Sequence, residues 1–508
     1  MATAKEKLAR SLEILCTFQK KGVVALRVED ISRTHRERLS DNGFLREITR
    51  GWYMVSDPST ARGDSAAWLA TYWSFCVQYF FYKFENEYFI SADQSLLIHA
   101  GNTTIPTQLI IKSPKASNTK IDLIGDCSFF EMRAHMPELS NIQTYHGLNI
   151  HSRVSSLIYC SPSIYKRFPD DVAIVLSSFK DASEILSILL ERSHTVIAGR
   201  LAGAFRFLGM DTIADDILSS MKAAGHTVWE VNPFENNVCL PELSSSSPHA
   251  KRLEVLWKKF RQDIIKRFPE SPALNKDISA YLKNIDSLYV QDAYHSLSIE
   301  KYTVSFELIE KVRRGNWDTI DDPETKKQID TMAARGYWLA SQSVRKSIEK
   351  ILEGSPSGEV IERDHALWYK ELFSPSVRAG IIAPSALAGY RMGPVYIAGS
   401  RHVPMNKDAL REALPIYFDL LKQEKHAGVR AVLGHFFFVY IHPYMDGNGR
   451  MARFLMNAML ASGGYPWTVI PVEKRDVYMN ALEEASVDEN ILPFAELISS
   501  MIIKTMKE

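Results

Sequence analysis

The sequence predicts a multidomain protein that ends in an all-α bundle carrying one β-hairpin, preceded by a small helix-and-hairpin domain and a mixed α/β region. Three observations support this prediction. A chain of 508 residues is too long for one hydrophobic core. The Ser-rich segment 241–249 has the composition of a linker. Beyond it, apolar residues recur at helical spacing to the C-terminus, except in a Gly- and Pro-bracketed stretch at 390–404.

The composition excludes several classes of protein. Lys plus Arg and Asp plus Glu both total 60, so no overall charge favours nucleic acid or an acidic substrate. No apolar segment approaches the roughly 20 residues of a membrane span, and we expect no membrane partner. The five cysteines are scattered without a Cys-x-x-Cys pair, which argues against a metal cluster and favours a reducing, cytoplasmic location: Cys16, Cys76, Cys127, Cys160 and Cys239.

The first domain, residues 1–57, has a winged-helix pattern. Apolar spacing predicts three helices and then a hairpin around Arg50-Gly51: helices at 4–20, 29–32 and 33–39, and strands at 44–48 and 52–55. Residues 1–50 hold 11 Lys and Arg against 7 Asp and Glu. Arg33, Arg36 and Arg38 would lie on the recognition helix, which predicts DNA contact through residues 27–55. The alternative is that this winged helix contacts another protein.

Residues 58–240 mix the two kinds of secondary structure. A helical pattern at 66–81 is followed by β-like runs at 108–112 and 172–176, which predicts an α/β or α+β unit. The pattern then becomes helical over 182–225. The glycines of segment 199–203 lack the Lys-Ser/Thr of a phosphate-binding loop and predict close packing through small residues instead. After the linker, residues 250–508 form the helical domain.

The segment 442–453, His-Pro-Tyr-Met-Asp-Gly-Asn-Gly-Arg-Met-Ala-Arg, has the backbone chemistry of a phosphate site. Gly447 and Gly449 flank Asn448, so the chain can turn sharply and direct successive N–H groups at one point. A helix starting here would add the partial positive charge of its N-terminus. A Gly-rich turn between two helices is the structural alternative.

The side chains of the same segment favour the functional interpretation. Arg450 and Arg453 are three residues apart and share one face of a helix. Asp446 is the one carboxylate among these donors and suits a Mg²⁺ shared with phosphate oxygens. His442, at the end of an apolar helical run, is the candidate base. His435, seven residues earlier, is expected to be a hydrogen-bonded core histidine.

The segment resembles the signature of the Fic family, His-Pro-Phe-x-Asp/Glu-Gly-Asn-Gly-Arg-x-x-Arg, with Tyr444 in place of Phe and Ala452 where Gly is common. The resemblance implies an enzyme that transfers AMP from ATP to a Ser, Thr or Tyr hydroxyl of a target protein or of itself. It assigns each residue a role, with Mg²⁺ as the metal: His442 as general base, Asn448 with the amides of Gly447 and Gly449 at the α-phosphate, Asp446 at the metal, and Arg450 and Arg453 at the β- and γ-phosphates.

Two further segments resemble parts of Fic proteins. Ser296 and Glu300 are four apart near the end of a helix predicted at 286–300, similar to the inhibitory motif Ser/Thr-x-x-x-Glu-Gly/Asn. This implies that Glu300 pairs with Arg453 and competes with the nucleotide, and that Glu300 could orient a water for the reverse, de-AMPylating reaction. Lys301 replaces the usual Gly or Asn. The hairpin at 390–404 resembles the family's target-docking flap, with Val395, Tyr396 and Ile397 at its centre.

A second function from another class remains open at this point. The N-terminal part weakly resembles AbiEi-type antitoxins, through Trp52-Tyr53 and Tyr88-Phe89 among others. The chain could therefore be a DNA-binding repressor in which the Fic module senses nucleotide. The sequence does not name the target protein, and a homo-oligomer is compatible with it.

Overall fold

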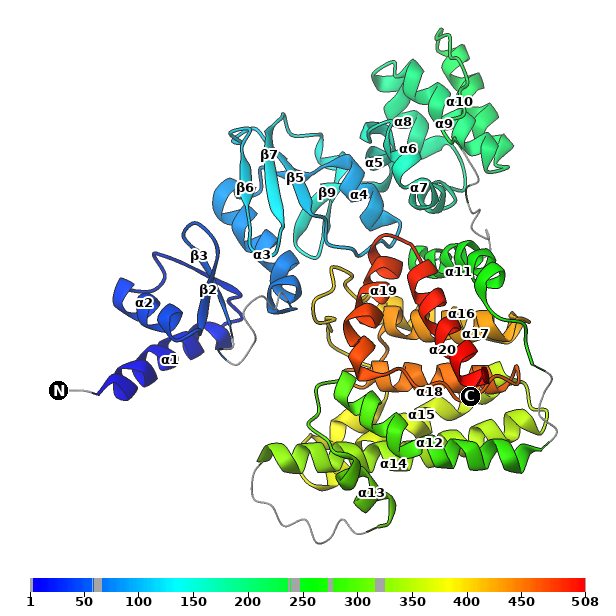
Figure 1. Ribbon diagram of the computed structural model, residues 1–508. Coiled ribbons are helices and arrows are strands. Elements are labelled where there is room, and N and C mark those ends of the chain that lie inside the picture. The colour runs from blue at the N-terminus through cyan, green and yellow to red at the C-terminus, as the bar shows by residue number, and fades with distance from the viewer. Residues whose placement is uncertain are drawn as a thin grey trace. The chain divides into compact units, whose positions relative to one another are not determined.

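The computed structural model describes residues 3–56, 58, 66–235, 238, 247–272, 277–315 and 325–507. The chain divides into two compact units, which are described separately (Figure 1). The first comprises residues 1–248 with 396–403, and the second comprises residues 249–395 with 404–508. The proposed linker, 241–249, lies largely outside the described residues, and so does Cys239.

The N-terminal part of the first unit contains two helices and a small antiparallel sheet in the order β1-β3-β2. Its elements are α1 (Ala4–Lys20), β1 (Ala25–Arg27), α2 (Arg33–Asp41), β2 (Leu45–Thr49) and β3 (Trp52–Val55). The pairing of β2 with β3 confirms the predicted hairpin. The helix predicted at 29–32 is wrong, because the Asp30 carboxylate accepts the Arg27 N–H at 2.8 Å and closes a turn there.

The arginines of α2 are engaged within their own domain. Arg33 forms an ion pair with Glu37 at 2.6 Å, and Arg36 donates to the Val28 carbonyl at 3.1 Å. Arg38 donates to the carbonyl of Lys7 and to the hydroxyl of Ser11. DNA binding through residues 27–55 stays a prediction, and the contacts of these three arginines do not favour it.

The middle of the first unit is the expected mixture of helix and sheet. Strand β5 runs parallel to β7 in a sheet ordered β4-β5-β7-β6, and β8 pairs with β9. Aromatic side chains of α3 pack on this sheet, as between Phe80 and Phe129, whose ring centroids are 4.8 Å apart. The elements are α3 (Ala66–Phe84), β4 (Phe89–Ile90), α4 (Ala92–His99), β5 (Gln108–Ser113), β6 (Lys120–Asp122), β7 (Ser128–Arg133), η1 (Leu139–Asn141), β8 (Ile142–Tyr145) and β9 (Leu148–His151).

The last part of the first unit is helical. It contains α5 (Arg153–Tyr159), α6 (Ile164–Arg167), α7 (Pro169–Leu176), α8 (Ser183–Glu191), α9 (Thr195–Phe207) and α10 (Asp211–Ala223). The β-like run predicted at 172–176 is wrong: it lies inside α7, because a short apolar run fits a buried helix as well as a strand. A Cβ at Gly199 would lie 1.9 Å from the Trp229 carbonyl oxygen, so this glycine does serve close packing, against an extended segment.

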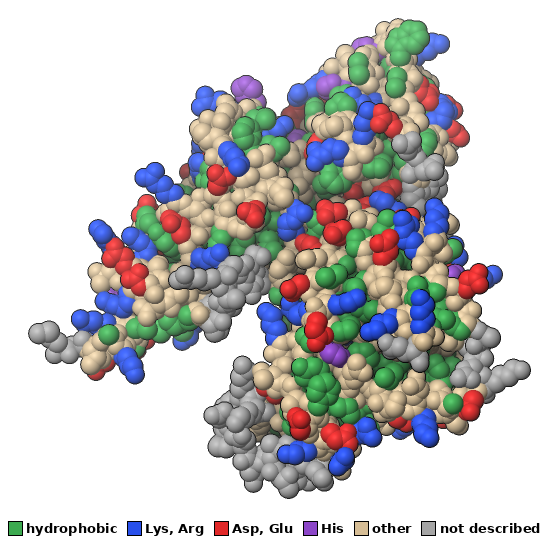
Figure 2. Space-filling model, viewed as in Figure 1, with side chains coloured by type: hydrophobic (Ala, Val, Ile, Leu, Met, Phe, Trp, Pro, Cys, Tyr) green, Lys and Arg blue, Asp and Glu red, His purple; other side chains and the backbone are tan. Residues whose placement is uncertain are grey.

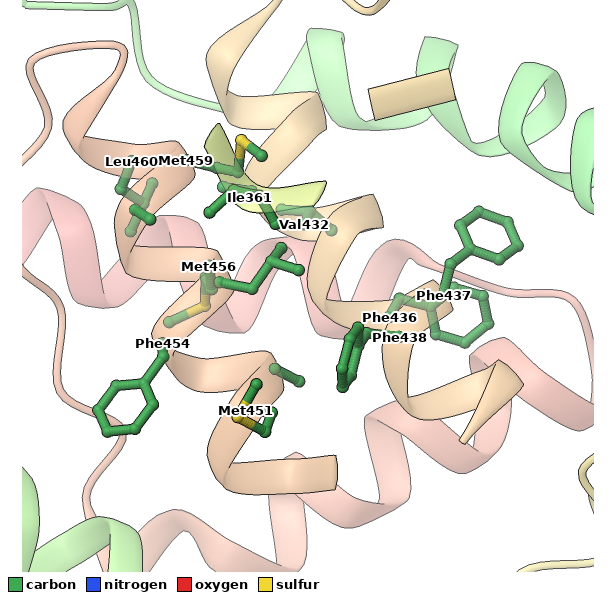
Figure 3. Close-up of a cluster of buried hydrophobic side chains, with 14 of the residues drawn as sticks. Ile361, Val432, Phe436, Phe437, Phe438, Met451, Phe454, Met456, Met459 and Leu460 are labelled. Atoms are coloured by element: carbon green, nitrogen blue, oxygen red, sulfur yellow. The ribbon is translucent and has the colours of Figure 1, made fainter. Parts of the chain in front are cut away.

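The second unit is an all-α bundle, as predicted. Its helices are α11 (Pro248–Arg267), α12 (Ile278–Ile299), α13 (Phe306–Arg313), α14 (Thr325–Leu352), α15 (Ser357–Arg378), η3 (Pro384–Ala388), α16 (Lys407–Gln423), α17 (Ala427–Ile441), α18 (Asn448–Ala461), η4 (Val472–Lys474), α19 (Arg475–Val487) and α20 (Leu492–Lys507). Figure 3 shows side chains of α15, α17 and α18 in one cluster, with Val432 and Met456 among them. Because α17 and α18 are buried on nearly all sides, the loop between them is held by the core of the bundle.

The hairpin predicted at 390–404 is not a paired ladder. The chain turns at residues 397–400, where the Ser400 N–H donates to the Ile397 carbonyl at 3.1 Å, but no strand forms over 390–404. Pro394 and Pro404 lack N–H groups, which removes ladder donors from both arms. Residues 396–403 group with the first unit, in which the Ile105 N–H donates to the Arg401 carbonyl at 2.8 Å.

The surface shown in Figure 2 interleaves basic and acidic side chains, in keeping with the equal totals of the sequence. Within the described part of the chain, no helix combines the length and the apolar character that crossing a bilayer requires.

Candidate active site

The segment 442–453 begins as the turn between α17 and α18, and two left-handed residues shape it. His442 ends α17 with φ 54° and ψ 63°, and Gly447 precedes α18 with φ +80°. Pro443 cannot continue α17, because it has no N–H to donate. A left-handed conformation costs a non-glycine residue roughly 1–2 kcal/mol, so His442 is held there by its surroundings.

The imidazole of His442 is in the form that a general base requires. Its Nδ1 lies 3.1 Å from the Val439 carbonyl oxygen, which can only accept, so Nδ1 carries the proton and Nε2 keeps its lone pair. Burial, assisted by the positive charge of Arg391, lowers the pKa of His442 to about 4, although the hydrogen bond to Val439 opposes the shift. The ring is therefore neutral at pH 7.

Asn448 holds the loop closed. Its Nδ2 donates to the Tyr444 carbonyl at 2.8 Å, and its Oδ1 accepts the Tyr444 N–H at 3.0 Å. The residue is only 1% exposed. In this conformation both polar atoms of the side chain are bound to Tyr444, and a contact of Asn448 with an α-phosphate stays a prediction. The backbone N–H of Asn448 is the group left for an anion.

The N-terminus of α18 has three N–H groups without an intrahelical partner. The first intrahelical bond runs from Met451 N–H to the Gly447 carbonyl, so the N–H groups of Asn448, Gly449 and Arg450 have no partner within the helix. They converge at the positive end of the helix dipole. A Cβ at Gly447 would lie 2.7 Å from the Phe373 ring, and the positive φ also requires glycine there.

A carboxylate from another helix already lies beside this N-terminus. Glu300 follows α12, and its Oε1 would be 2.4 Å from a Cβ placed on Gly449. Oε1 also accepts a hydrogen bond from Nη2 of Arg453 at 2.7 Å. Burial alone would raise the pKa of Glu300, but the attraction of Arg453 and Arg450 outweighs it and lowers that pKa below its usual value.

Ser296 completes the contact that was expected between α12 and Arg453. Its hydroxyl accepts from Nε of Arg453 at 2.8 Å, and its carbonyl accepts from Nη2 at 3.0 Å. The residue after Glu300, Lys301, adopts φ +66°, a conformation that normally favours Gly or Asn. The chain therefore makes a left-handed turn here in spite of the lysine.

Arg450 and Asp446 form a second, more open pair. The Arg450 guanidinium lies between the rings of Tyr302 and Phe373, 5.1 Å from each centroid, and its Nη2 is 3.3 Å from Asp446 Oδ2. The Asp446 side chain is 66% exposed. Among the described residues, no three His, Cys, Asp or Glu side chains are grouped as a metal site. A Mg²⁺ held by one carboxylate, water and phosphate oxygens would fit Asp446.

The structure thus brings together residues 296, 300 and 442–453. The flap residues Val395, Tyr396 and Ile397 lie outside helices and strands, with Val395 buried and Tyr396 39% exposed. Sequence reasoning missed that Arg391 donates to the His442 carbonyl at 2.7 Å, because a lone arginine ahead of Gly393-Pro394 does not show which groups its N–H donors bind. His435 is hydrogen-bonded to Tyr478 at 2.7 Å in the core, as expected.

These features define a helical domain in which a neutral histidine precedes a helix N-terminus with unpaired intrahelical N–H groups. Residues 352–460 match the model of the Fic/DOC family, which confirms the resemblance indicated by the 442–453 motif.

Named relatives agree with this match. The chain is 27% identical over 239 residues to the "Protein adenylyltransferase Fic" of Drosophila willistoni, covering 46% of this chain and 44% of the relative. The Drosophila grimshawi protein of the same name is 28% identical over 223 residues, covering 43% and 42%. The chain thus spans less than half the length of these curated relatives. Among solved structures, Fic-1 (residues 134–508) of C. elegans aligns with a TM-score of 0.38 and 17% identity, over 68% of this chain and 97% of that one.

Proposed function

We propose that the protein is a protein adenylyltransferase that transfers AMP from ATP to a Ser, Thr or Tyr hydroxyl of a target protein, and to itself. The observation that carries the proposal is the conjunction of the neutral His442 with the free amides at the start of α18. The relatives named as adenylyltransferases support it.

The geometry suits an in-line displacement at the α-phosphate. Nε2 of His442 takes the proton of the target hydroxyl, whose oxygen bonds to the α-phosphorus while the bond to the β-phosphate oxygen breaks and pyrophosphate leaves. The N–H groups of residues 448–450 stabilise the charge on the α-phosphate. Arg450 and Arg453 bind the β- and γ-phosphates. A Mg²⁺ beside Asp446, when bound, would neutralise the pyrophosphate.

In the conformation described here, the enzyme would be inhibited by its own α12. Glu300 and Ser296 occupy Arg453, and the Glu300 carboxylate lies beside Gly449 at the start of α18. Two anions cannot share this site, because close like charges repel strongly where water is excluded. Release of Glu300 is thus a condition for productive binding. From the resemblance we keep the expectation that Glu300 could instead orient a water for de-AMPylation.

The flap remains a proposed docking segment. Residues 395–397 lie outside helices and strands, so their backbone groups could offer hydrogen bonds to a target strand without demanding a particular sequence.

Incubation with ATP labelled on the α-phosphate tests the proposed activity. We expect weak labelling of the wild-type protein and of lysate proteins, stronger labelling by Glu300→Gly, and none when His442→Ala is added to that variant. Retained nucleotide binding by the double variant would separate loss of the base from loss of the fold. If folded Glu300→Gly transfers no label, with or without lysate, the proposed function is wrong.

A further inference from the structure

A buried arginine connects the catalytic loop with the base of the flap. Arg391 is 1% exposed, and among the described residues no carboxylate forms an ion pair with it. Its guanidinium donates instead to four carbonyl oxygens: His442 at 2.7 Å, Ile441 at 3.3 Å, Gly393 at 3.3 Å and Met405 at 2.5 Å. Its backbone N–H donates to the Pro443 carbonyl at 2.9 Å.

Such an arrangement is costly to maintain. A buried charge without a counter-ion is unfavourable unless its donors are satisfied, and burial lowers the pKa of Arg391 to about 10. The group is still charged at pH 7. Its donors meet the carbonyls at the C-terminus of α17, the negative end of that helix, which offsets part of the cost.

The position of these bonds bears directly on the base. His442 has a left-handed backbone conformation, and this conformation determines the directions of both its carbonyl and its imidazole ring. Arg391 binds that carbonyl at 2.7 Å and the one before it, while its other two bonds reach the two ends of the flap, at Gly393 and Met405. One side chain therefore binds both the residue that would take the proton and the base of the flap, which is the segment proposed to dock the target.

We propose that Arg391 is a positioning residue, which holds His442 in its left-handed conformation and joins it to the base of the flap. The proposal rests on the proposed adenylyl transfer for its kinetic consequence, but its consequence for the His442 ring can be measured without any turnover.

Charge gives a second effect of the same side chain. Burial is the main reason that the His442 pKa is low, Arg391 lowers it further, and the carboxylates of Glu300 and Asp446 raise it. Removing Arg391 should therefore raise the His442 pKa. Since the neutral ring is the base, the acid limb of the pH–rate profile should move to higher pH.

The test compares Arg391→Met and Arg391→Lys with Arg430→Met, all in the Glu300→Gly protein. Arg430 is a matched control, because it binds the Glu424 carbonyl at 2.6 Å and Ser462 at 2.8 Å near the opposite end of α17. We expect Arg391→Met to lower kcat about 100-fold, the usual effect of a misplaced catalytic group, with the KM for ATP changed less than about threefold. Arg391→Lys should fall between Arg391→Met and the parent. Arg430→Met should lower Tm and leave kcat nearly unchanged.

Histidine NMR measures the titration of His442, which should stay unchanged if Arg391 only stabilised the fold. In Arg391→Met, which removes the positive charge, the His442 resonance should titrate at higher pH, while Arg391→Lys, which keeps a charge, and Arg430→Met should titrate close to the parent. An unchanged His442 titration in folded Arg391→Met, or equal kcat losses at 391 and 430, would overturn the proposal. If the Glu300→Gly parent transfers no AMP, the proposed function fails and the titration alone still decides the role of Arg391.

Discussion

Lys301 offers the sharpest test of inhibition by α12. The end of this helix is closed by two hydrogen bonds, from Lys301 N–H to the Ser298 carbonyl at 3.0 Å and from Tyr302 N–H to the Leu297 carbonyl at 3.1 Å. This is the Schellman arrangement, in which the left-handed residue is normally glycine. Lys301 adopts φ +66° there, so Lys301→Gly should relieve about 1 kcal/mol of strain.

The consequence for activity depends on where that strain exists. If the turn opens when Glu300 leaves Arg453, Lys301→Gly stabilises the inhibited state alone. One kcal/mol then lowers the basal AMP transfer about fivefold. It should also raise Tm by about 2–4 °C if the helical unit unfolds as one domain. Labelled-ATP transfer and thermal unfolding measure the two effects.

Lys301→Ala is the matched control for this variant. It removes the same exposed side chain but keeps a Cβ at a positive φ, so it should give neither the increase in Tm nor the decrease in transfer. A Lys301→Gly protein that transfers more AMP than wild type would refute the reasoning. Equal behaviour of the Gly and Ala variants would show that charge, and not backbone strain, governs the end of α12.

Three further predictions follow from the same contacts. Ser296→Ala removes the partner of Arg453 Nε and should weaken inhibition by about 1–2 kcal/mol, seen as roughly 5- to 30-fold more basal transfer, which stays below that of Glu300→Gly. Because the folded-state pKa of Glu300 is lowered, its ion pair with Arg453 is complete above the ordinary carboxyl pKa and is lost only as pH falls through the lowered value, so basal transfer should show no release of inhibition through neutral pH. The Glu300→Gly variant should keep its transfer rate below the usual histidine pKa of about 6.5, since His442 stays neutral there. Asn448→Ala should lower both Tm and transfer, with loss of protection of the loop amides in hydrogen exchange. A variant that loses transfer with Tm and protection unchanged would instead support a direct contact of Asn448 with the phosphate.

The parts of the site that sequence could predict are those written in consecutive residues. Gly447, Gly449, Arg450 and Arg453 are spaced as a turn followed by one helical face, and the structure has that form. The pairing of Glu300 with Arg453 joins residues 153 positions apart, and it was reached through resemblance to a family motif, not through physical spacing.

The two wrong secondary-structure predictions and the missing role of Arg391 have physical reasons. The run at 172–176 was assigned to a strand because five apolar residues carry no period that separates strand from buried helix. The turn at Asp30 is predicted as a helix because an apolar pattern does not show the hydrogen bond from the Arg27 N–H to the Asp30 carboxylate. No role for Arg391 could be predicted, because its four acceptors are backbone carbonyls, which every sequence contains.

In the proposed function, Gly449 links inhibition to catalysis. A side chain there would collide with the Glu300 carboxylate, whose Oε1 would lie 2.4 Å from its Cβ, so the inhibited state needs a bare backbone at this position. A phosphate approaching the same N–H groups would need it too. The anion site at the start of α18 thus fits two anions by the same geometry. Because Glu300 is part of the chain, ATP would compete with a carboxylate at fixed local concentration, and anything that withdraws α12 by a few ångströms would favour ATP.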